Sequence, residues 1–82
     1  MLTFEALREA REYCETNVLP HYEVPSANDL ARALLRCDLR DAEQALAEND
    51  LVRGIDSLTR LNEWIATHKA RESQKEENLQ NG

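Results

Sequence analysis

The apolar residues between positions 30 and 46 recur at helical spacing, and they fall on two separate stripes of one helix. The first stripe consists of Leu30, Leu34 and Cys37. The second stripe consists of Leu35, Leu39, Ala42 and Leu46. The second stripe is rotated from the first by roughly 110°, at about 100° per residue. One neighbouring helix buries one stripe, so the pattern predicts two neighbours, one of which a second protein could supply.

Two further segments carry the same helical periodicity. Residues 4–18 predict a helix whose inward stripe consists of Phe4, Leu7, Cys14 and Val18. Residues 51–71 predict another, with a stripe of Leu51, Ile55, Leu58, Leu61 and Ile65. Trp64 borders that stripe, and we expect Gly54 to permit a close helix crossing. The chain therefore divides into three amphipathic segments.

Proline residues separate the first two helices. Residues 19–25 are interpreted as a linker, because Pro20 and Pro25 each bias the preceding residue away from helical conformation. The second helix begins after Ser26, a capping residue, and extends to about residue 47. We interpret it as continuous, because its polar arc stays in phase. The alternative is a break near positions 37 and 38.

The second and third helices meet at a tight turn of Glu48, Asn49 and Asp50. Asparagine tolerates the left-handed conformation that ends helices, and Asp50 can cap the helix that follows. Such a short connection makes the two helices antiparallel neighbours. We predict an all-α fold, a small three-helix domain with an antiparallel helical hairpin, which forms a dimeric bundle. In that arrangement Leu39→Asp should give monomers or unfolded chain.

Composition agrees with a small helical domain. The 82 residues make one domain at most, and a chain of this size is marginally stable alone. Leucine and alanine dominate the apolar residues, which argues against a sheet. We assign residues 1–71 to the helical domain. Residues 72–82 form a polar tail with one apolar residue, which we expect to fray or to be disordered.

The net charge of −6 and the pI of about 4.8 disfavour nonspecific attraction to nucleic acid and suit a partner with a basic face. No apolar stretch reaches the length of a membrane span, and the start of the chain lacks the pattern of a signal peptide. We therefore expect a cytoplasmic protein that does not contact membranes.

Residues capable of catalysis or metal binding are few and poorly spaced. Cys14 and Cys37 are interpreted as buried free thiols, with a disulfide between the first two helices as the alternative. His21 and His68 share no metal-ligand spacing with each other or with the cysteines. Two glycines cannot build a phosphate-binding loop. We expect no catalytic residues, no metal and no cofactor, and thus no enzyme.

A basic ridge on the second helix supports an alternative function. Arg32, Arg36 and Arg40 recur every four residues on one side of this helix. The segment Pro25-Ser26-Ala27-Asn28-Asp29-Leu30-Ala31, with Leu34, Ala45-Leu46 and Leu51-Val52, resembles the winged helix-turn-helix of bacterial regulators. The resemblance covers about 28 residues and implies a DNA-binding transcriptional regulator with Arg36 and Arg40 near its recognition helix. The usual glycine of the turn is replaced by Leu35-Arg36-Cys37, and no β-wing follows.

Binding to another protein through apolar helix faces accounts for more of the chain. We expect a small acidic adaptor or inhibitor that regulates its partner, and also a homodimer. A structural subunit of a larger assembly is a further alternative. The candidate partner-binding residues are Leu35, Leu39, Leu46, Leu61 and Trp64.

Overall fold

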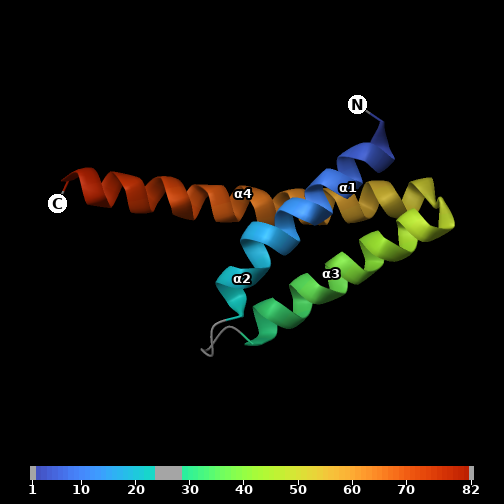
Figure 1. Cartoon of the computed structure of the whole chain (residues 1–82), viewed down its shortest axis with the longest axis horizontal. Coiled ribbons are helices and arrows are strands. Elements are labelled where there is room, and N and C mark those ends of the chain that lie inside the picture. Colours follow the sequence, from blue (N-terminus) through green and yellow to red (C-terminus); the bar gives the residue numbers. More distant parts are fainter. Residues whose placement is uncertain (1, 24–28, 82) are drawn as a thin grey trace.

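The computed structural model describes the backbone of residues 2–23 and 29–81, and side-chain surroundings as far as residue 74. Within these residues the chain is helical and contains no strand, so the predicted all-α class is confirmed. The elements are α1 (Thr3–Tyr13), a π-helical segment (Cys14–Val18), α2 (Leu19–Tyr22), α3 (Asp29–Glu48) and α4 (Leu51–Asn81). Figure 1 shows that α1 and α2 form one rod across α4, while α3 and α4 diverge from their shared turn.

The first rod continues through Pro20, so the predicted linker is wrong for Leu19–Tyr22. The π-helical segment explains how the proline is accommodated. Its wider turn ends with the Leu19 N–H donating to the Cys14 carbonyl, five residues back. Pro20 then lies in the first turn of α2, where a missing N–H costs least. Pro25 and Ser26, and with them the predicted cap, lie outside the described residues.

The second helix is continuous from Asp29 to Glu48, as predicted. The turn after it also follows the sequence prediction. Asn49 adopts a positive φ of 53°, in the left-handed region that ends helices. The Asp50 carboxylate then accepts a hydrogen bond from the Arg53 N–H at 3.1 Å and caps α4. From this turn α3 and α4 diverge (Figure 1), and the antiparallel hairpin stays a prediction.

The core lies where the first rod crosses the pair formed by α3 and α4. Its buried residues are Leu7, Ala10, Cys14, Val18, Tyr22, Leu35, Leu39, Ala42, Ala45 and Leu61. At the crossing, a Cβ added to Gly54 would lie 3.3 Å from Cε1 of Phe4 and 3.6 Å from Cδ2 of Leu7. This confirms that Gly54 permits a close approach of α1 to α4.

The apolar stripe predicted for α4 is partly wrong. Leu51 and Ile55 are 52% and 51% exposed, while Gly54 and Ser57 are buried in their place. The small face of Gly54 admits the ring of Phe4, so the helix turns that face to the core and leaves its larger neighbours outside.

The last helix is also longer than predicted. It continues past residue 71 to Asn81, because no proline or glycine occurs between residues 72 and 81 and Glu, Gln, Lys and Leu favour helix. The division into a domain of residues 1–71 and a tail stays a prediction. No helix within the described residues combines the length and apolarity required to cross a membrane.

Candidate partner-binding groove

The two apolar stripes of α3 have different surroundings. Leu35 and Leu39 are 0% and 6% exposed, because the first rod and α4 cover them. Leu30 and Leu34 are 73% and 51% exposed, and Cys37 is exposed beside them. The sequence analysis assigned the second stripe to a partner, but the chain covers that stripe itself and leaves the first one open.

The other predicted partner-binding residues are divided between the core and the surface. Leu61 is fully buried in the core, and Leu46 packs against the core at its edge. Leu35, Leu39 and Leu61 are therefore covered by the chain itself, and their role as contact residues stays a prediction. Trp64 is half-buried and faces a groove.

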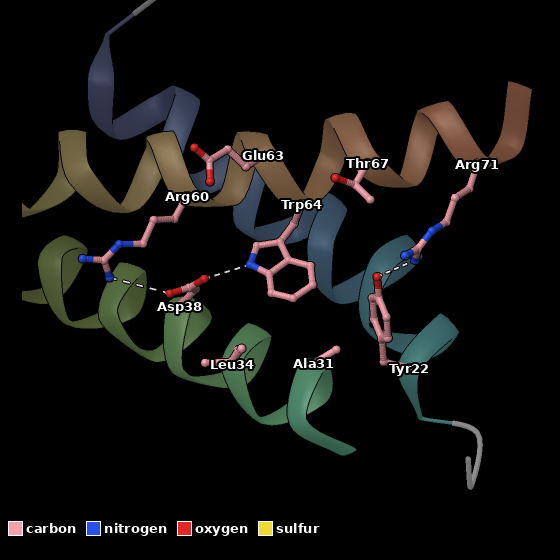
Figure 2. Close-up of a pocket in the computed structure, with 9 residues that line it drawn as sticks. All are labelled: Tyr22, Ala31, Leu34, Asp38, Arg60, Glu63, Trp64, Thr67 and Arg71. Atoms are coloured by element: carbon pink, nitrogen blue, oxygen red, sulfur yellow. Dashed lines mark hydrogen bonds and ion pairs between the residues drawn. The ribbon is translucent and has the colours of Figure 1, made fainter. Parts of the chain in front are cut away.

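This groove lies between α3 and α4 and has a volume of about 510 Å³. Figure 2 shows its walls, which come from both helices, with α2 closing one end. Its lining residues are Tyr22, Ala31, Leu34, Asp38, Arg60, Glu63, Trp64, Thr67 and Arg71. The groove exists because α3 and α4 touch near their turn and then diverge (Figure 1). The exposed side chain of Leu34 forms part of its α3 wall.

Two contacts fix the indole of Trp64 in this groove. Its Nε1–H donates to Oδ2 of Asp38 at 2.8 Å, across the gap between the helices (Figure 2). Tyr22 packs edge to face against the indole, with ring centroids 5.6 Å apart. The Tyr22 hydroxyl in turn accepts a hydrogen bond of 2.6 Å from Nη1 of Arg71. The aromatic floor of the groove is thus held in one orientation before any partner arrives.

Charged side chains line the edges of the groove. The guanidinium of Arg60 lies 3.6 Å from a carboxylate oxygen of Asp38 and 3.2 Å from one of Asp41, and it also pairs with Asp56. Glu63 lines the same stretch, and within the described part of the chain no cationic group lies within 4 Å of its carboxylate. The single guanidinium of Arg60 therefore lies among several carboxylates.

The predicted basic ridge is largely neutralised. Arg32 pairs with Asp29 at 3.0 Å, and Arg36 pairs with Glu23 at 2.8 Å. Arg40 is exposed and has no carboxylate within 4 Å among the described residues.

The helix-turn-helix arrangement implied by the resemblance is not formed. Leu35-Arg36-Cys37 lies inside the continuous helix α3, so the expected turn is missing at that position. Leu51-Val52 begins helix α4, where the resemblance implies a strand. The geometry that would present a recognition helix to DNA is therefore not built from these residues.

The two cysteines are free thiols in different environments. Cys14 is buried, with its sulfur 3.8 Å from the Leu61 carbonyl oxygen. Burial, aided by the charges of Glu15 and Asp38, raises the pKa of this thiol from 9.0 to about 11. Cys37 is exposed, so the prediction that both thiols are buried is wrong for this residue, and the alternative disulfide is not formed.

The histidines come together, although no spacing pattern in the sequence paired them. The rings of His21 and His68 lie 6.2 Å apart, and His68 also contacts the ring of Tyr13 edge on. In residues 2–23 and 29–74, no three His, Cys, Asp or Glu side chains are placed to hold a metal ion together.

Sequence reasoning missed three residues that shape the groove, Tyr22, Asp38 and Arg71. Tyr22 lies in the segment interpreted as a linker. Asp38 and Arg71 are polar and belong to none of the apolar stripes. The chain matches no protein-family model, and comparison with curated proteins and with solved structures gives no match. The groove is therefore the feature of the chain from which its function is inferred.

Proposed function

We propose that this chain is a non-catalytic protein–protein interaction module, a small acidic adaptor or inhibitor that binds and regulates another protein. The supporting observation is the groove between α3 and α4, with Trp64 fixed on its floor and Leu34 exposed on its wall. Tryptophan, tyrosine and arginine are the residue types most enriched at energetically important contact sites. Trp64, Tyr22 and Arg71 supply all three in one place.

The exposed leucines strengthen this proposal. Leu30 and Leu34 lie one turn apart on α3 and extend the apolar surface outward from the groove. Contiguous apolar surface beside a groove is typical of protein interaction sites, since a partner removes that surface from water. A partner helix placed there would complete the second set of neighbours that the two stripes of α3 require.

The dimeric bundle also stays a proposal, at a different surface from the one first expected. Leu51, Val52 and Ile55 are exposed on one side of the start of α4, and Val52 is 80% exposed. We propose that a second copy covers this patch. These three side chains are apolar, so a second copy that covers them removes apolar surface from water. A dimer of this kind leaves the groove open.

A tagged pull-down from lysate of the source organism tests the main proposal. We compare the wild-type chain with Leu34→Asp, which places a charge in the groove, and with Leu2→Asp, the same substitution at an exposed leucine outside both the groove and the proposed dimer patch. Circular dichroism checks that all three are equally helical. Bound protein is identified by mass spectrometry, and nucleic acid is measured by absorbance.

We expect one stoichiometric protein on the wild type and on Leu2→Asp, and its loss on Leu34→Asp. Equal capture by all three would refute the groove as the contact site. Nucleic acid released by moderate salt, without a protein and dependent on Arg36 and Arg40, would support the DNA-binding alternative. A partner that is always present in constant ratio and unchanged in activity would support the structural subunit.

A further inference from the structure

The Arg60 end of the groove carries an excess of negative charge. Arg60 is shared among Asp38, which lines the groove, and Asp41 and Asp56, which lie just outside it, so one guanidinium faces three carboxylates. Glu63 adds a fourth carboxylate on the α4 wall. The other cation that lines the groove, Arg71, lies toward the α2 end and is hydrogen-bonded to the Tyr22 hydroxyl (Figure 2).

From this charge distribution we infer that the groove binds a basic amphipathic helix of another protein, an inference that rests on the proposed function. Its apolar residues, spaced three and four apart, contact Leu34, Ala31 and Trp64. Its lysine or arginine residues face Glu63 and the carboxylates around Arg60. The binding mode is that of a helix laid in a hydrophobic groove.

The shape of the groove favours a helix as the occupant. Its two walls are themselves helices that diverge from a common turn, and a third helix packs between two helices by placing its ridges in their grooves. An extended peptide that binds by strand addition needs the free edge of a sheet. The described residues contain no strand to offer such an edge.

Charge selects a basic helix over an acidic one and over a second copy of this chain. Carboxylates near Arg60 that are not fully paired attract cations and repel anions, which affects both the choice of partner and the rate of association. A second copy would bring the same acidic edge and a net charge of −6 toward this one. The apolar patch at the start of α4 avoids the contact between two acidic groove edges, although the net charge of each copy is unchanged.

The experiment uses Trp64, the chain's only tryptophan, as a fluorescent reporter inside the groove. Two synthetic peptides of about 18 residues, near five helical turns, carry the same leucine stripe and lack tryptophan and tyrosine. One has lysine on its polar face and the other has glutamate. Each is titrated into the full chain at low and at moderate salt.

We expect the lysine peptide to shift Trp64 emission in a saturable way and to bind at least about tenfold more tightly than the glutamate peptide. Added salt should weaken its binding. Equal or tighter binding of the glutamate peptide would overturn the inference, and so would a lack of response to both peptides. The proposed function fails separately, when Leu34→Asp captures the same proteins as the wild type.

A pair of charge variants distinguishes an effect of the groove on peptide binding from an effect of the net charge of the chain. Glu63→Lys changes the groove edge, while Glu12→Lys makes the same change in net charge on the exposed face of α1. We expect Glu63→Lys to weaken the lysine peptide by about three- to tenfold, and Glu12→Lys by less than about twofold. Equal effects of the two variants would show that only net charge matters and would contradict a specific site.

Discussion

The two stripes of α3 contain the same kinds of residue, but one is buried in the core and the other is exposed. Leu35 and Leu39 are enclosed by the first rod and α4, whereas Leu30 and Leu34 face the solvent at the groove. The difference lies in the number of neighbours that one short chain can supply. The first rod and α4 cover one side of α3, and no described helix covers the other. An apolar stripe therefore shows that a surface favours burial, but not which molecule buries it.

The largest expected effect comes from truncating one leucine on each stripe. Leu35→Ala removes a fully buried side chain and should lower the free energy of unfolding by about 2–5 kcal/mol. Leu34→Ala should lower it by no more than about 1 kcal/mol, because half of that side chain is already in water. Urea denaturation followed by circular dichroism measures both. Similar losses in the two variants would show that the stripes are not distinct.

The buried Cys14 allows a second test, through the change in the free energy of unfolding at alkaline pH. The pKa of Cys14 is raised by burial, so below about pH 9 the thiol is protonated in both states and its contribution to stability is complete. Between pH 9 and about 11 the unfolded chain loses this proton more readily than the folded one. The free energy of unfolding should therefore fall by about 1–3 kcal/mol in total as the pH rises.

The measurement compares urea denaturation of the wild type and of Cys14→Ala across this pH range. The difference between the two free energies of unfolding at each pH removes the contribution of the other groups that titrate in this range. Cys37→Ala is the matched control, because it removes a thiol at an exposed position and leaves Cys14 in place. An identical slope in wild type and Cys14→Ala would contradict the raised pKa.

A smaller effect is expected from the contact between the indole and the carboxylate across the groove. Trp64→Phe removes the hydrogen bond to Asp38 while keeping an aromatic ring on the groove floor. Combined with Asp38→Ala in a double-mutant cycle, it should give a coupling free energy of about 1 kcal/mol. A coupling near zero would mean that the indole is not held by this carboxylate.

The smallest effect belongs to the basic ridge. Arg36 and Glu23 are both about half exposed, so Arg36→Gln should change the free energy of unfolding by no more than about 0.5 kcal/mol. Thermal melts at low and high salt measure this change, which should shrink as salt is added. A loss above about 1 kcal/mol would indicate that the pair secures the end of α2 against α3.

Features that depend on neighbouring residues along the chain could be predicted from the sequence alone. Helical spacing predicted the all-α class and the continuity of α3, and Asn49 with Asp50 predicted the turn and the cap. Such features are set by contacts within a few residues, and the residue types involved leave few alternatives. The prediction of a linker at Pro20 was wrong, although proline generally disfavours helix. The π-helical segment before Pro20 places it in the first turn of α2, where it is tolerated.

The packing of the helices against one another sets which apolar surface stays exposed. The ring of Phe4 packs against Gly54, so α4 presents its Gly54 face to the core. Leu51 and Ile55 therefore lie outside the core. The groove brings Tyr22 and Asp38 to Trp64 from two other helices. Periodicity along one helix fixes the angle between its stripes, but burial depends on the helix that packs against each stripe. That choice is made by contacts between residues far apart in the sequence, where local pattern carries no information.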